Sequence, residues 1–66
     1  MANLKTKTGL PAPLLTIKQV ANHCGVSEKT VRRWIEGHDL MAAKLGAQWR
    51  IRPQDLELFI KEHLKW

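Results

Sequence analysis

Basic side chains at helical spacing are the residues of this 66-residue chain that point most directly to a chemistry. At about 100° per residue, Lys29 and Arg33 lie opposite an apolar cluster formed by Val31, Trp34 and Ile35. Lysine binds a phosphate as a point charge, whereas arginine can also hold a guanine base through two hydrogen bonds. A helix with this basic face is a candidate for a nucleic-acid groove, although a solvated surface is the commoner role of helix charges.

Metal and catalytic chemistry find little support in the sequence. His23, Cys24, His38 and His63 match no zinc-ligand spacing, so we expect no metal and no cofactor. No glycine-rich phosphate loop, nucleophile motif or pair of catalytic carboxylates is present. The sequence therefore predicts a protein that is not an enzyme.

The three tryptophans could stack on bases or fill a core. Trp34 and Trp49 both fall on apolar faces, which favours core packing. Trp66 leaves both possibilities open, because it could cover the last helix or dock on a partner.

The charge balance agrees with a polyanionic partner. Eleven Lys and Arg residues oppose six Asp and Glu residues, which gives a net charge of +5 on a single small domain. The longest apolar run, from Leu40 to Ala43, is far too short to span a bilayer. Cys24 is the only cysteine, so no internal disulfide can form. Since the N-terminus also lacks a signal-peptide core, we expect a soluble, cytoplasmic protein.

Two short helices are predicted to carry and support the basic face. Thr16 and Gln19 form a capping-box pattern that begins the first helix, and Gly25 ends it. Ser27 is placed to cap the second helix, which ends at Gly37. The residues of the first helix that are expected to face inward are Ile17, Val20, Ala21 and Cys24. Two helices joined by so short a link form a helix-turn-helix pattern.

The segment after the second helix alternates in a way that predicts a β-hairpin. Pairing Leu45 with Trp49 puts apolar residues on one side, and pairing Lys44 with Arg50 puts cations on the other. This register requires a three-residue loop over residues 46–48. A two-residue loop would bring Lys44 beside Trp49 and mix the two sides. The sequence therefore predicts the longer loop and a wing with one basic side.

A third helix is predicted to follow the hairpin. Pro53 suits its first position, and Leu56, Phe59 and Ile60 form the stripe that is expected to pack inward. Leu58 falls on the far side, where it is either an ordinary surface leucine or a contact between copies bound at adjacent DNA sites.

The chain is predicted to divide into an arm and one domain. Residues 1–13 are expected to form a flexible basic arm, because they contain Lys5 and Lys7, no acid, and prolines near their end. This arm could be a frayed terminus or could rest on phosphates. Residues 14–66 are expected to form the domain, a mainly α winged helix-turn-helix with a small β-hairpin.

The ordered combination of these segments resembles the small excisionase family, also called recombination directionality factors, which has a MerR-like winged helix-turn-helix. The matching residues are Leu15-Thr16-Ile17-Lys18-Gln19-Val20-Ala21, Gly25-Val26-Ser27, Thr30-Val31-Arg32-Arg33-Trp34-Ile35, Leu45-Gly46 and Trp49-Arg50-Ile51. The resemblance implies that the second helix enters the major groove of double-stranded DNA and that the wing reaches the neighbouring minor groove. It also implies DNA bending, cooperative binding by a protein that is monomeric when free, and a tyrosine integrase steered toward excision.

The resemblance assigns DNA contacts by position. The helix contacts are Ser27, Lys29, Thr30, Arg32 and Arg33, and the wing contacts are Lys44 and Arg50. Gln48 at the wing tip is a further candidate DNA contact of this chain. Three departures concern neighbouring positions. The family often has proline where Met41 stands, glycine where His38 stands, and a basic wing tip where this chain has Ala47 and Gln48. The last departure shifts the expected wing contact toward Arg50 and Lys44.

Other interpretations stay open. Proteins with this domain include transcription regulators, and a basic face could instead meet an acidic protein in an interaction module. Arg32 could pair with Glu36 one turn further along the helix rather than contact DNA.

Overall fold

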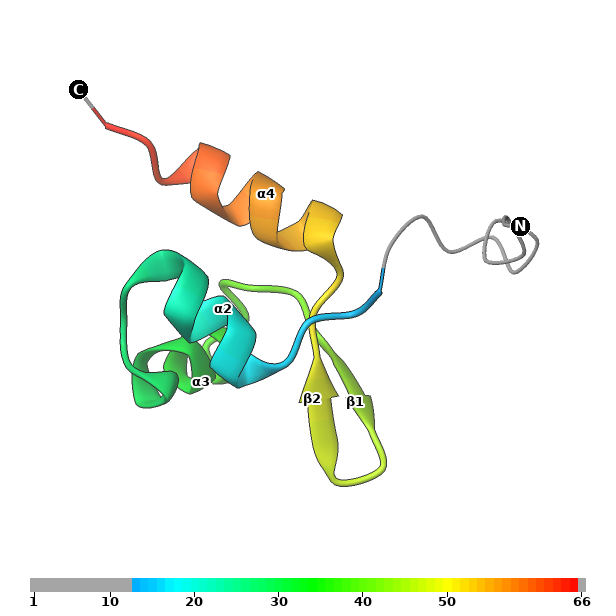
Figure 1. The fold of residues 1–66 in the computed structure, drawn as a ribbon. Coiled ribbons are helices and arrows are strands. Elements are labelled where there is room, and N and C mark those ends of the chain that lie inside the picture. Colours follow the sequence, from blue (N-terminus) through cyan, green and yellow to red (C-terminus); the bar gives the residue numbers. More distant parts are fainter. Residues whose placement is uncertain (1–12, 66) are drawn as a thin grey trace.

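The computed structural model describes residues 13–65 of the chain. Its elements, labelled in Figure 1, are α2 (Ile17–Cys24), α3 (Glu28–Glu36), β1 (Ala43–Leu45), β2 (Gln48–Arg50) and α4 (Pro53–Glu62). These three helices and one antiparallel hairpin confirm the predicted fold class, a mainly helical winged helix-turn-helix. Most of the predicted arm, residues 1–12, and Trp66 lie outside the described residues, so the predictions about them remain predictions.

Helix α2 begins and ends where the capping pattern predicts. The Thr16 hydroxyl accepts a hydrogen bond from the Gln19 amide at 3.0 Å, and the Gln19 side chain accepts one from the Thr16 amide at 2.9 Å. Gly25 follows with a left-handed φ of 70°, and its amide and the Val26 amide both donate to the Ala21 carbonyl. This tight exit lets α3 begin at once and pack against α2.

The link after α3 also depends on a left-handed residue. His38 has a φ of 64°, and the amides of Asp39 and Leu40 donate back to the Trp34 carbonyl at 2.8 and 3.1 Å. Histidine tolerates this conformation better than branched residues do, but glycine adopts it without strain. The left-handed backbone conformation therefore explains why the family that this sequence resembles often has glycine at this position.

The core joins all parts of the described chain. Its buried hydrophobic side chains are Ile17, Val20, Ala21, Val31, Ile35, Leu40, Ile51, Leu56 and Phe59. The inward faces predicted for α2, α3 and α4 are thereby confirmed. Trp34 and Trp49 are half-buried against this core, as predicted, and the Trp34 and Phe59 ring centroids are 4.7 Å apart. Cys24 also packs there, and its burial raises the pKa of the thiol.

A third strand position lies beside the hairpin. The Leu15 amide donates to the Ile51 carbonyl at 2.7 Å, and the Ile51 amide donates to the Leu15 carbonyl at 2.8 Å. This bridge fastens the chain before α2 to the segment between β2 and α4 (Figure 1). The sequence did not predict it, because a single bridged residue produces no alternating pattern.

The predicted hairpin register is wrong by one residue. The observed pairs are Ala43–Arg50, Lys44–Trp49 and Leu45–Gln48. The loop therefore has two residues, Gly46 and Ala47, and the three-residue loop is excluded. Gly46 has a φ of 65° at the first loop position, which matches a type II′ turn, a connection whose twist suits a hairpin.

The new register changes the faces of the wing. Ile51 is 0% exposed and faces the core, so Trp49 and its partner Lys44 lie on the core-side face. Arg50 and Leu45 lie on the opposite face, and the predicted single basic side is wrong. The mixed face is stable because the Lys44 ammonium lies 5.3 Å from the centroid of the Trp49 ring, where a cation is attracted to the indole. The same register leaves the Leu45 side chain 53% exposed on the face away from the core.

Helix α4 begins at Pro53, as predicted, and is fixed by an ion pair. Arg52 donates through Nε and Nη2 to the Asp55 carboxylate at 2.5 and 2.9 Å. These hydrogen bonds, together with the charge of Asp55, raise the pKa of Arg52. At the other end of the helix, His63 Nδ1 lies 2.7 Å from the Phe59 carbonyl oxygen, and the two rings are in contact.

We predict that Ile51→Ala destabilises the domain strongly, because it removes a fully buried side chain at the bridge to Leu15. The expected loss is about 2–5 kcal/mol of unfolding free energy, seen as a lower urea midpoint or an unfolded circular dichroism spectrum. Leu58→Ala is the control, because Leu58 is 54% exposed and its loss should cost less than about 0.5 kcal/mol. Equal losses in the two variants would contradict the assignment of Ile51 to the core.

Candidate nucleic-acid interface

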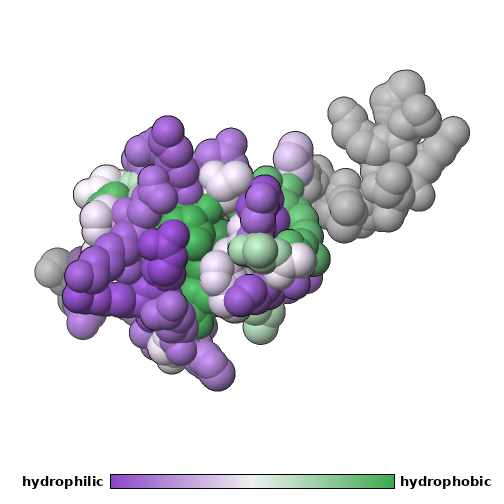
Figure 2. Space-filling model, turned by 90° about the horizontal axis from the view of Figure 1, so that it is seen from below, coloured by the Kyte–Doolittle hydropathy of each residue, from purple (hydrophilic) through white to green (hydrophobic). Residues whose placement is uncertain are grey.

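Helix α3 and the hairpin tip lie on the same side of the molecule. Figure 1 places both at its lower edge, with α4 on the opposite side. Figure 2 looks onto this lower side and shows a broad hydrophilic area on the left, where α3 lies. A narrow apolar stripe separates this area from the part of the surface that the hairpin forms. One extended partner could therefore contact α3 and the wing together.

The predicted helix contacts lie on the solvent face of α3. Lys29, Arg32 and Arg33 are exposed, whereas Val31 and Ile35 on the other face are buried. Three cations consequently project from a helix whose position is fixed by its apolar face.

The two predicted hydroxyl contacts at the start of α3 already have partners. The Ser27 hydroxyl accepts a hydrogen bond from the Thr30 amide at 3.1 Å, which confirms Ser27 as the N-cap. The Ser27 and Thr30 hydroxyl oxygens are also 3.0 Å apart and share a hydrogen bond. These side chains hold the first turn in place, and Ser27 remains exposed beside Lys29.

The helix cations are not neutralised by nearby carboxylates. Between residues 13 and 65 the only ion pair joins Arg52 to Asp55, so the possible pair between Arg32 and Glu36 does not form. Glu28 lies in the first turn of α3, where a negative charge favours the helix dipole. The central part of the exposed face is therefore positive.

The wing presents one cation on each face, and both are held in place. The Arg50 guanidinium donates to the Trp49 carbonyl at 2.8 Å and to the Gln48 side-chain oxygen. Lys44 lies over the Trp49 ring on the other face. Gln48, predicted as a DNA contact, thus also orients Arg50, a role that its position two residues away on the same strand face could have indicated.

Arg52 is a basic residue of the hairpin segment with a different role. Its guanidinium is committed to Asp55 at the start of α4, so its charge is largely compensated. The ion pair was not predicted, although an Asp three residues after an Arg at the start of a helix is a recognisable pairing.

The described part of the chain was also considered as a metal-binding or membrane-spanning unit, and its residues fit neither. Over residues 13–65, no group of three or more His, Cys, Asp or Glu side chains is placed to hold a metal ion. None of the helices in this part is long and apolar enough to cross a membrane.

Comparison with known proteins gives one result that bears on this geometry. A family model described as a helix-turn-helix domain matches residues 14–64, which include α2, α3, the hairpin and α4. Searches of curated proteins and of solved structures returned no significant match. The matched family includes excisionase-like helix-turn-helix proteins. With two helices joined at Gly25 and an exposed basic second helix, the chain belongs to the helix-turn-helix domain family, a family of DNA-binding domains.

Proposed function

We propose that the protein binds double-stranded DNA sequence-specifically, with α3 in the major groove. The observation that carries this proposal is the exposed basic face of α3, formed by Lys29, Arg32 and Arg33 opposite a buried apolar face. A helix is about 10–12 Å across with its side chains, and the major groove is about 12 Å wide. The arginines supply base recognition and the lysine supplies a phosphate contact, because only the guanidinium is a planar bidentate donor.

The hairpin contributes a second contact in the adjacent minor groove. Lys44 and Arg50 project from opposite faces of the wing, so each can meet one of the two phosphate backbones that border that groove. The contacts within the hairpin restrict both side chains before binding, which reduces the conformational entropy lost on the DNA.

The biological role that we propose is that of a recombination directionality factor. Such a protein bends DNA and directs a tyrosine integrase toward excision of a mobile element. The support is the resemblance described above and membership of a family that includes excisionase-like proteins. The same membership is compatible with a transcription regulator, so the two roles must be separated by their behaviour on DNA.

The assignment of α3 predicts that Lys29→Ala and Arg33→Ala each weaken specific binding while the fold survives. Loss of a base-contacting arginine should cost about 1–3 kcal/mol, or roughly 5- to 150-fold in Kd, and relax the preference at one base pair. Fluorescence anisotropy with a selected duplex measures the change, and Lys61→Ala on α4 is the control, since Lys61 is exposed on another helix. Unchanged affinity in both α3 variants would remove α3 from the interface.

The wing assignment predicts a change in salt dependence. Arg50→Ala and Lys44→Ala should each reduce the slope of log Kd against log salt concentration by about 0.9 for one lost phosphate contact. If Arg50 enters a narrow minor groove, the loss should be larger for A·T-rich flanking sequence. A slope that stays the same in both variants would show that the wing does not touch phosphates.

The proposed directionality role predicts cooperative binding and bending. A single module of this size buries only about 600–1,000 Å² on DNA, so one copy should bind weakly and adjacent copies should support each other. Titration of one-site and two-site duplexes tests the cooperativity. The bend is measured from the gel mobility of complexes in which the binding site lies at different positions along the DNA fragment. Sedimentation should give a monomer without DNA. A stable free dimer, or the same affinity per site on both duplexes without bending, favours the regulator instead.

A further inference from the structure

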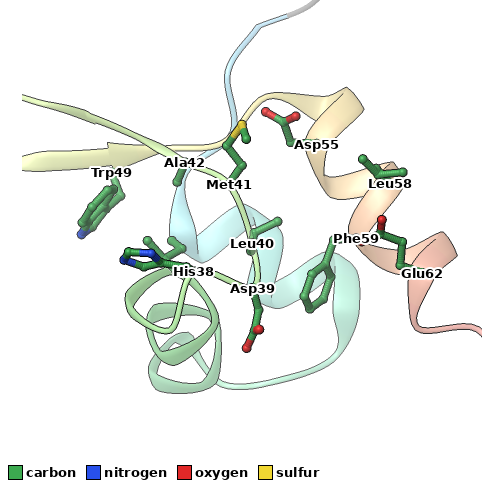
Figure 3. Close-up of a pocket in the computed structure, with 11 residues that line it drawn as sticks. His38, Asp39, Leu40, Met41, Ala42, Trp49, Asp55, Leu58, Phe59 and Glu62 are labelled. Atoms are coloured by element: carbon green, nitrogen blue, oxygen red, sulfur yellow. The ribbon is translucent and has the colours of Figure 1, made fainter.

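A groove on another face of the molecule is not used by the proposed DNA contacts. It has a volume of about 460 Å³ and lies between the link that follows α3, the hairpin and α4 (Figure 3). Its buried apolar residues are Ile35, Leu40 and Phe59, and Met41 and Leu58 are exposed at 66% and 54%. Large apolar side chains thus stay accessible to solvent on both sides of a hollow, and a segment with apolar side chains could cover them.

The charge of the groove is opposite to that of the rest of the protein. Three of the six acidic residues line it, namely Asp39, Asp55 and Glu62, and no lysine or arginine does. The charge of Asp55 is compensated by Arg52, but Asp39 and Glu62 form no ion pair with any residue from 13 to 65. On a chain of net charge +5, this hollow suits an occupant that has apolar side chains and positive charge.

The first twelve residues of the chain have that chemistry. They contain Leu4 and Leu10 for an apolar surface, Lys5 and Lys7 for carboxylates, and no acidic residue. No part of the proposed DNA interface uses them.

The attachment point of this segment lies close to the groove. Leu15 is bridged to Ile51 on one side. On the other side, the Ala43–Arg50 pair of the hairpin places the groove residue Ala42 next to Ile51. Two strand spacings correspond to about 10 Å. In Figure 3 the segment before α2 passes the end of the groove where Met41 and Asp55 lie.

We propose that residues 1–12 of the same chain dock in this groove. Leu10 is five residues from Leu15, a reach of up to about 17 Å, so it can arrive at the Met41 end. Lys7 and Lys5 then extend toward Asp39 and Glu62. A tether this short gives an effective concentration in the millimolar range, which exceeds that of a second copy at the micromolar concentrations of an ordinary sample. The groove is therefore expected to be occupied by the N-terminal segment of the same chain rather than by that of a second copy.

A spin label tests this docking on the full chain without DNA, so the result does not depend on the proposed function. A nitroxide is attached to Thr6→Cys in a Cys24→Ala background, since Cys24 is the only native thiol. In ¹⁵N-labelled protein at low salt, the amide signals of Met41, Leu58 and Glu62 should lose most of their intensity. The signals of Lys29 and Ala47, on α3 and at the hairpin tip, should keep theirs.

Matched variants connect the effect to the groove. Glu62→Lys should restore the lost signals, because it places a like charge beside the lysines of the segment. Glu57→Lys, on the same helix but not lining the groove, should leave the signal loss unchanged. Full intensity at the groove in the labelled parent would overturn the proposal. The proposal would also be overturned if the signal loss appeared only after protein without ¹⁵N but with the nitroxide was mixed with ¹⁵N-labelled protein. That result would assign the groove to a second copy.

Discussion

The antiparallel bridge between Leu15 and Ile51 is the constraint on which the rest of the structure depends. It joins the chain before α2 to the residue between β2 and α4, and the Ile51 side chain is fully buried beneath it. A two-stranded hairpin is only marginally stable in water, so the wing needs this attachment to keep a fixed position relative to the helices. A small domain has few alternative contacts, and loss of this one would separate the wing from α2.

Helix α3 can present a positive face because only one stripe of its side chains packs in the core. Val31 and Ile35 are buried and Trp34 packs on Phe59, which fixes the helix through one stripe. The remaining positions carry no packing requirement and are free to hold charge. The Ser27 cap and the left-handed Gly25 hold the start of α3 against α2, so the cations are placed by backbone geometry rather than by contacts of their own.

Much of this arrangement could be predicted from local chemistry. The capping box at Thr16, the cap at Ser27 and Pro53 at the first turn of α4 depend on neighbouring residues only, and each is observed. The hairpin register could not be predicted the same way. Separation of apolar and charged faces predicts that Lys44 avoids the face of Trp49, but an ammonium over an indole removes most of the cost of mixing them. A two-residue turn at Gly46 also matches the strand twist. The exposed face of α3 was expected, whereas the engagement of Arg50 by Gln48 depends on a geometry that only the correct register provides.

The hairpin is held at both ends by buried residues, Leu40 before β1 and Ile51 after β2, while its tip touches nothing in the core. An insertion of two residues in each strand would keep every existing side chain on its face and lengthen the wing by about 6.8 Å. A single inserted residue would instead force a bulge or a new loop type. The length of the wing can therefore diverge among descendants of this sequence in steps of two residues per strand, with the helices and their packing left unaltered.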